Sequence, residues 1–266
     1  MSTTPRSSST PRGQSRKPAP TCTCEFRFYE ELNDYLPPDQ RKRTISRAIT
    51  GTPSVKDAIE SLGVPHTEID LILVDGRSVR FDRRLRGGER IAVYPEFERF
   101  DISPLHRLRP KPLREPRFVA DVHLGTLARF LRLLGFDTRY GNGLDDAELA
   151  AITSREKRIL LTRDVGLLKR KAVVRGQWLR SHDPEQQVME IVEALHLKRL
   201  LRPFTRCMAC NGELVAIARK EVADLVPPRV YRRFRSFRQC HECRRVFWRG
   251  THFLRLKRLV AIVKST

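Results

Sequence analysis

The sequence predicts a mixed α/β protein built from more than one domain. Three observations indicate this fold class. Short strands with period-two hydrophobicity surround one helix near the start, apolar strands alternate with helices from residue 117 onward, and two Cys-x-x-Cys pairs follow in an arginine-rich stretch. With 266 residues, of which 40% are hydrophobic and 31% charged, the chain is long enough for two or three compact units and apolar enough to form cores.

The composition also excludes some classes of protein. No apolar run approaches the ~20 residues that a membrane-spanning helix needs, so we expect neither a membrane-embedded segment nor a membrane partner. Residues 1–24 carry four positive charges, no negative charge and no apolar stretch, which predicts a disordered basic tail and not a secretory signal. The expected location is therefore the cytoplasm.

Positive charge is the strongest global feature. The chain has 52 Lys and Arg residues against 31 Asp and Glu residues, a net charge of +21. Residues 200–266 alone hold 16 basic and 4 acidic residues, and arginines alternate with aromatic residues over 230–238. Such a stretch favours contact with nucleic-acid phosphates. The alternatives are charge that only keeps the protein soluble, or attraction to an anionic membrane surface.

Residues 25–97 are predicted to form one α+β domain. A helix is expected at 53–63, where Ser54 or Thr52 caps the start and Gly63 ends it. Strands are expected at 24–29, 43–49, 69–74, 77–81 and 90–94. This order of elements resembles the β-grasp fold of ubiquitin-like and sulfur-carrier proteins.

A di-glycine in this domain tests the sulfur-carrier resemblance. Residues 85–95 resemble the last loop and strand of the sulfur carriers, which work through a free C-terminal di-glycine. Here the chain continues past Gly87-Gly88, so we interpret both glycines as turn residues. The domain is then expected to act as a scaffold or to bind a protein partner, with a role in sulfur transfer or conjugation as the rival hypothesis.

The next stretch is predicted to form a stiff linker followed by a parallel-sheet domain. Five prolines between residues 95 and 116 indicate the linker, at 98–116. The sheet domain, at 117–200, has expected strands at 117–120, 137–140, 158–162 and 177–180 and expected helices at 124–134, 146–152 and 184–196.

Acidic residues follow two of these strands. Asp121 and Asp164 each come directly after a strand, and Asp146 begins a helix. The carboxyl ends of parallel strands meet at one edge of a sheet, so these carboxylates are expected to lie close together. Crowded carboxylates select a hard cation such as Mg²⁺ or Mn²⁺, and such a site can hydrolyse phosphodiester bonds. The alternative is that these residues are ordinary turn and cap residues.

Three segments carry a resemblance to a known family: 118–121, 127–137 and 159–164, which read FVAD, LARFLRLLGFD and ILLTRD. Residues 117–255 resemble the Mut-seven C-terminal ribonuclease family, a PIN-like nuclease domain with an appended zinc ribbon. The resemblance implies a metal-dependent endoribonuclease whose acids are Asp121, Asp164 and one of Asp145, Asp146 and Glu148, with Asp146 the first choice. Asp183 could be a fourth acid or part of a polar loop.

Four cysteines form the clearest metal motif of the sequence. Cys207 and Cys210 make one Cys-x-x-Cys pair, and Cys240 and Cys243 make a second pair, with 29 residues between the two pairs. Two such pairs predict a tetrathiolate zinc site, which is structural because no position is left open for water. The basic zinc ribbon is expected at 201–258, followed by a tail at 259–266. Cys22 and Cys24 are assigned no metal.

The basic residues near these sites are the candidates for RNA binding. Arg129 and Arg132 could grip phosphates or be solvated charges of a helix face, whereas Arg163 is the better candidate because it precedes Asp164. The full set of predicted RNA contacts is Arg163, Arg232, Arg233, Arg235, Arg238, Arg244, Arg245 and His252. The alternative to an enzyme is a non-catalytic RNA-binding or ribosome-associated factor that keeps a nuclease-like fold.

Overall fold

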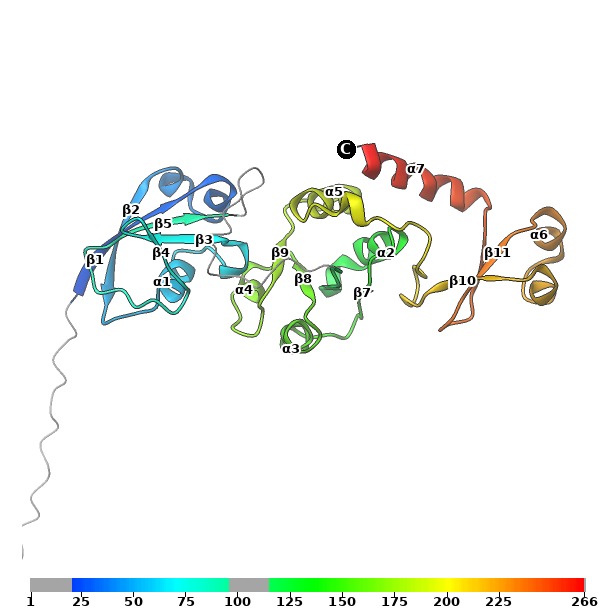
Figure 1. Cartoon of the computed structure of the whole chain (residues 1–266), viewed down its shortest axis with the longest axis horizontal. Helices are drawn as coiled ribbons and strands as arrows, with labels where there is room; N and C mark the ends of the chain where they lie inside the picture. Colours follow the sequence, from blue (N-terminus) through cyan, green and yellow to red (C-terminus); the bar gives the residue numbers. More distant parts are fainter. Residues whose placement is uncertain (1–20, 96–114, 266) are drawn as a thin grey trace, which may run out of the picture.

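A computed structural model describes residues 21–95 and 115–265 of the chain. Three units follow one another along its longest axis: an N-terminal sheet domain, a central parallel-sheet domain and a C-terminal ribbon (Figure 1). The predicted tail up to residue 20 and almost all of the predicted linker at 98–116 lie outside the described residues. Within the described ranges, no helix has both the length and the apolar character needed to cross a membrane.

The N-terminal domain is a mixed sheet that packs on one helix. Its strand order is β2-β1-β5-β3-β4, in which β1 runs parallel to β5 and the other neighbours are antiparallel. The elements are β1 (Thr21–Phe28), β2 (Thr44–Thr50), α1 (Val55–Ser61), β3 (Leu71–Val74), β4 (Arg77–Ser78) and β5 (Arg90–Tyr94), with short 3₁₀ turns at Glu30–Tyr35, Pro38–Gln40 and His66–Glu68.

Local chemistry explains the boundaries of these elements. The Ser54 side chain accepts a hydrogen bond from the Asp57 amide and so caps α1. Asp75 and Gly76 both have positive φ at the tight β3–β4 turn. Strand β1 begins at Thr21, so the expectation of a disordered tail up to residue 24 is wrong for the last four residues: Thr21 pairs with Thr50 at the end of β2, and the strand continues as far as its partner does.

The central domain has four parallel strands in the order β7-β6-β8-β9. Its elements are β6 (Phe118–Ala120), η4 (Val122–Leu124), α2 (Gly125–Leu133), β7 (Thr138–Arg139), α3 (Asp146–Glu156), β8 (Ile159–Thr162), α4 (Val165–Leu168), β9 (Gly176–Trp178), α5 (Pro184–Ala194) and the 3₁₀ turn η5 (Leu197–Leu200).

Both faces of the central sheet are buried, because successive side chains of a strand point to opposite faces. Phe118 of β6 and Leu161 of β8 enter one core, which α2 and α5 cover. Val119 and Leu160, their neighbours in the chain, enter a second core, which α3 and α4 cover. The unbroken apolar runs that predicted these strands are therefore explained by helices on both sides.

The C-terminal ribbon is an antiparallel sheet of order β10-β11-β12 followed by a long helix. Its elements are β10 (Leu214–Ile217), the 3₁₀ turn η6 (Arg219–Val222), α6 (Pro228–Arg233), β11 (Phe237–Cys240), β12 (Val246–Trp248) and α7 (Thr251–Ser265). The prediction of a tail at 259–266 is wrong for the described residues up to Ser265. Leu259, Val260 and Val263 of α7 are buried in the same core as side chains of α2 and α5, so the helix returns to the central domain.

The predicted fold class is confirmed. The chain is mixed α/β, with a parallel-sheet domain, a separate N-terminal sheet domain and four cysteines gathered near the C-terminus. Gly87 and Gly88 lie in the loop before β5, with φ of +101° and +82°. A side chain at Gly87 would place its Cβ 2.1 Å from Cβ of Cys22, so this position requires glycine for conformation and for space.

Candidate functional site

An acidic edge lies where β6 and β8 end. The two strands are parallel neighbours, and Ala120 pairs with Leu161, so Asp121 and Thr162 come next to each other at the same edge of the sheet. The Thr162 hydroxyl donates to Oδ2 of Asp121 at 2.7 Å and accepts from the amide of Asp164 at 3.0 Å. One buried hydroxyl therefore ties together the two segments that carry the predicted acids.

The two carboxylates of this edge differ in exposure. Asp121 is 9% exposed, and its Oδ1 accepts from the Val122 amide. Asp164 is exposed and caps α4 by accepting from the Gly166 amide at 2.7 Å. Arg163, which directly precedes Asp164, lies against the ring of His182, with Nη1 of Arg163 2.7 Å from Nδ1 of His182. Both predicted acids, one shielded and one open to solvent, belong to the same edge.

The other predicted acids are placed differently. Asp146 lies at the start of α3 and pairs with Arg170 at 3.0 Å, where both side chains are about half exposed. Asp145 and Glu148 form the capping box of that helix. Asp183 caps α5 by accepting from the Gln186 amide. In the described part of the chain, Asp121, Asp146 and Asp164 do not make a group of three close enough to hold one ion.

The four cysteines of the predicted zinc site do come together. Sγ atoms of Cys207, Cys210, Cys240 and Cys243 all lie within 4.8 Å of one another, with 3.3 Å between Cys210 and Cys240 and 3.7 Å between Cys207 and Cys243. Zinc–sulfur bonds of about 2.3 Å in a tetrahedron place sulfur atoms at a comparable separation. The cluster therefore has the ligand type, number and spacing that could bind zinc.

The thiols of this cluster differ in acidity. Burial raises the pKa of Cys207 to about 12. Burial also opposes ionisation of Cys210, but hydrogen bonds from the Gly212 amide and from neighbouring thiols lower its pKa to about 7. Zinc binds thiolates, so binding at this cluster would release protons.

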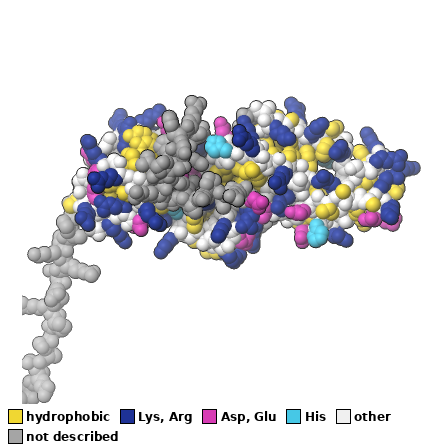
Figure 2. Space-filling view, viewed as in Figure 1, with side chains coloured by type: hydrophobic (Ala, Val, Ile, Leu, Met, Phe, Trp, Pro, Cys, Tyr) yellow, Lys and Arg dark blue, Asp and Glu magenta, His cyan; other side chains and the backbone are white. Residues whose placement is uncertain are grey.

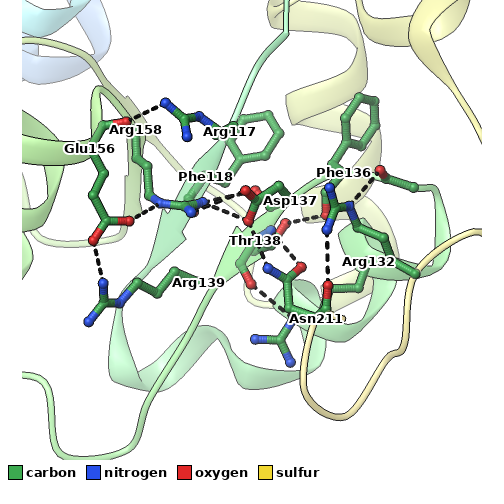
Figure 3. A network of polar contacts seen from close by, with 12 residues as sticks. Arg117, Phe118, Arg132, Phe136, Asp137, Thr138, Arg139, Glu156, Arg158 and Asn211 are labelled. Carbon is green, nitrogen blue, oxygen red and sulfur yellow. Dashed lines mark hydrogen bonds and ion pairs between the residues drawn. The ribbon is translucent and has the colours of Figure 1, made fainter. Parts of the chain in front are cut away.

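A polar network joins the turn around Cys207 and Cys210, here called the first cysteine knuckle, to the central domain (Figure 3). Arg132 is buried and donates to the carbonyls of Thr138, Met208 and Ala209 at 2.8–3.2 Å. Asn211 donates to Asp137 at 2.7 Å and accepts from the Thr138 amide at 3.0 Å. Arg132 is thus committed to backbone carbonyls, which contradicts the suggestion that it could grip phosphates.

The same network contains a charge cluster at the start of β8. Arg158 is 8% exposed and contacts Asp137 at 2.8 Å and Glu156 at 2.6 Å. Glu156 also pairs with Arg139. Burial opposes ionisation of Asp137, but hydrogen bonds from Arg158 and Asn211 hold its pKa below the usual range. These charges are compensated within the fold, which indicates a structural role.

The predicted RNA-contact residues are all exposed in the structure. Arg232 and Arg233 lie on α6, at the end of the molecule farthest from the N-terminal domain (Figure 1). Basic side chains gather at this end of the molecule (Figure 2). The remaining exposed residues of the predicted set are Arg163, Arg235, Arg238, Arg244, Arg245 and His252. Arg163 lies at the acidic edge, directly before Asp164, whereas Arg232 and Arg233 of α6 lie far from it along the molecule (Figure 1).

The N-terminal domain packs against β9, the edge strand of the central sheet. The Trp178 amide donates to Glu68 at 2.9 Å, and the Trp178 ring lies 4.7 Å from that of Tyr35. Nε2 of His66 lies 2.8 Å from the Val173 carbonyl oxygen, and Nδ1 lies 2.6 Å from Glu60. Sequence reasoning missed this interface and also Thr162, because both depend on which strands become neighbours.

Comparisons with known proteins agree with this geometry. Residues 116–260 match the family model described as "Mut7-C RNAse domain", and residues 21–101 match the model described as "Mut7-C ubiquitin". The human protein named "Exonuclease mut-7 homolog" is 36% identical over 106 residues, which are 38% of this chain and 12% of that protein. No solved structure matches. Because the nuclease model covers more than half of the chain, including the acidic edge and all four clustered cysteines, the chain belongs to the Mut7-C RNase family and carries a Mut7-C ubiquitin domain at its N-terminus.

Proposed function

We propose that the protein hydrolyses RNA phosphodiester bonds within the strand, as a PIN-like endoribonuclease, at the edge formed by Asp121 and Asp164. The observation that carries this proposal is the Thr162 hydroxyl, which holds the two acidic segments together at the carboxyl ends of β6 and β8. Ligand sites of open parallel sheets lie at this end of the strands. The family match and the name of the human relative support a nuclease.

The donor set at this edge fits Mg²⁺ or Mn²⁺. Both candidate ligands are carboxylate oxygens, and Mg²⁺ is commonly held by one or two carboxylates together with substrate phosphates. Such an ion supplies an activated water and neutralises charge on the scissile phosphate. Asp121 would hold its carboxylate in one orientation through Thr162 and the Val122 amide. Asp164 caps α4 through Oδ1 and is exposed, so its other carboxylate oxygen could meet the ion and the substrate.

Asp146 and Asp183 have weaker support as members of the site. The Asp146–Arg170 pair is exposed, and such pairs are worth at most about 1 kcal/mol, so Asp146 can leave it to meet a cation. Asp183 caps α5 as Asp164 caps α4, but the Thr162 hydroxyl joins the segments of Asp121 and Asp164, and Asp183 has no comparable link among the described contacts. Zinc at the four cysteines would be structural. Because zinc binds cysteines only in their reduced form, such a site favours location in a reducing compartment such as the cytoplasm.

The experiment that tests the proposal uses a circular RNA, which has no ends for an exonuclease. The zinc-loaded full chain is incubated with this RNA with Mn²⁺ or Mg²⁺ and without added divalent ion. We expect ion-dependent cutting that falls at least about 100-fold in Asp121→Asn and in Asp164→Asn. Asn caps a helix about as well as Asp, so both variants should fold. Asp82→Asn, at an exposed position of the N-terminal domain, is the matched control.

Other results have definite meanings. A drop in Asp146→Asn or Asp183→Asn but not in the control would add that residue to the site. Cutting of linear but not circular RNA would overturn the endonuclease assignment. RNA binding without any cutting would favour the alternative, a non-catalytic RNA-binding factor. Cutting that survives in both Asp121→Asn and Asp164→Asn would exclude this edge as the active site.

A further inference from the structure

A cavity of about 720 Å³ lies between the central domain and the zinc ribbon. One wall comes from η4 and the start of α2, and the other comes from the first cysteine knuckle and from β12 with the residue just before it. Its lining includes His123, Arg129, Tyr140, Met208, Arg245 and Phe247. We call this cavity the junction groove.

The junction groove is positively charged. Arg129 and Arg245 line opposite walls and are exposed, as is His123. No aspartate or glutamate is among the described residues that line the groove. Arg132 also lines it and adds its charge, although its donors are taken by backbone carbonyls. A groove with basic groups on both walls and no compensating carboxylate attracts a polyanion.

The groove also offers an aromatic surface. Phe247 of β12 is half-buried and lines the junction groove. The same residue, together with Met208, lines a second cavity of about 320 Å³ whose walls include Phe204, Trp248 and several arginines. Phe247 therefore stands between a basic cavity and an aromatic one. Nucleobases stack on such side chains while arginines hold the backbone, which is the usual way to bind single strands.

The groove reaches the acidic edge. Val122 lines the groove and follows Asp121 directly, and its amide donates to the Asp121 carboxylate at 2.6 Å. The Val122 carbonyl in turn accepts from the Tyr140 hydroxyl at 2.9 Å. The arginines of α6 are far from this edge, because α6 and β8 lie well apart along the long axis of the molecule (Figure 1).

We infer that the junction groove binds unpaired RNA, with backbone phosphates at Arg129 and Arg245 and a base stacked on Phe247, so that the strand leads to Asp121. The inference rests on the proposed function for what happens at that end of the strand. In this inference the first cysteine knuckle both holds zinc and shapes the RNA site, since Met208 and Ala209 form part of the groove wall. It also selects single-stranded over duplex RNA, because a paired base cannot leave its stack without unpairing.

The test measures RNA binding in the Asp164→Asn background, so that cleavage does not interfere. Zinc-loaded full chains bind a fluorescent single-stranded RNA or the same sequence as a duplex, across a range of salt concentrations. We expect Arg129→Gln and Arg245→Gln each to weaken binding and to reduce the slope of log K against log salt by about 0.7. Phe247→Leu should weaken single-strand binding roughly five-fold or more without changing that slope.

Arg232→Gln and Arg233→Gln on α6 test the competing basic surface, and Arg77→Gln, at an exposed position of the N-terminal domain, is the matched control for the loss of one charge. Zinc content and thermal unfolding of each variant show whether it is folded. The inference is overturned if the α6 variants weaken binding as much as the groove variants do, or if the duplex binds as tightly as the single strand and Phe247→Leu has no effect.

The outcome is separable from that of the cleavage test. Groove-dependent binding by a chain that never cuts RNA would refute the hydrolase and leave the groove in place. Cutting of RNA that is insensitive to Arg129→Gln, Arg245→Gln and Phe247→Leu would refute the groove and leave the hydrolase in place.

Discussion

At the scale of single residues, Thr162 organises the acidic edge. It is fully buried at the end of β8, and its hydroxyl serves two partners on different segments, the Asp121 carboxylate and the Asp164 amide. A buried hydroxyl in this position fixes the direction of a carboxylate that would otherwise rotate. Thr162 is thus a positioning residue for the proposed reaction.

Replacing this hydroxyl should separate positioning from folding. Thr162→Val keeps the shape but leaves the Asp121 oxygen and the Asp164 amide unpaired, so the free energy of unfolding should fall by about 1–3 kcal/mol. RNA cleavage under single-turnover conditions should fall as well. Thr162→Ser, which restores the hydroxyl, should recover the cleavage rate. A Val variant that cuts as fast as the original chain would show that Thr162 positions nothing.

At the scale of elements, the cysteine knuckles are built into the central domain. The first knuckle is held by Arg132 and Asn211, and α7, which follows β12, buries Leu259 and Val263 in the core of that domain. The ribbon is therefore fixed at both ends. The cysteine cluster brings Cys207 and Cys210 together with Cys240 and Cys243. We therefore expect zinc binding at this cluster to stabilise the fold of the ribbon.

Loss of zinc should unfold the ribbon and spare the N-terminal domain. Structural zinc sites contribute about 10 kcal/mol or more of apparent binding free energy, which is also folding free energy. We expect Cys240→Ser to lack zinc and to be cut by protease within residues 212–250, whereas Cys22→Ser keeps one zinc per chain. Zinc is measured by a colorimetric chelator after denaturation. Full zinc content in Cys240→Ser would contradict the tetrathiolate site.

The elements also show where sequence reasoning worked. The strands β6 and β8 and the helices α2, α3 and α5 follow from unbroken apolar runs and helical spacing, which are local signals. Helix α7 carried such a signal too, since Leu256, Leu259, Val260 and Val263 recur at helical spacing. It was missed because its apolar face is explained only by the central domain, which lies far away in the sequence.

At the scale of the whole molecule, the ubiquitin-like domain covers the open edge of the nuclease sheet. Glu68 accepts from the Trp178 amide of β9, a backbone donor that faces away from the neighbouring strand β8. The tilted rings of Tyr35 and Trp178 contact each other beside it. The Arg180 guanidinium lies 5.3 Å from the Trp178 ring, and Arg180 pairs with Asp34 at 3.1 Å. Burial raises the pKa of Tyr35. Because Trp178 pairs with Thr162 and its ring NH donates to the Arg163 carbonyl, the domain lies near the acidic edge.

Removing the central aromatic contact should loosen this packing. Trp178→Ala loses the contacts with Tyr35 and Arg180, so we expect the radius of gyration from small-angle X-ray scattering to increase and the two domains to unfold in separate transitions. Tyr29→Ala removes an aromatic pair with Tyr94 inside the ubiquitin-like domain and serves as the control. An unchanged radius and one shared transition in Trp178→Ala would contradict a packed interface.

The sequence by itself determined most of the strands and helices, the class of fold and the four cysteines that come together, because hydrophobic period and cysteine spacing are properties of short segments. Only the tertiary structure decided which strands are neighbours, and with that the link from Thr162 to Asp121, the separate placement of Asp146, the return of α7 and the groove beside the ribbon. Each of these joins residues that are distant in the chain, and such contacts are selected by the packing of the whole fold.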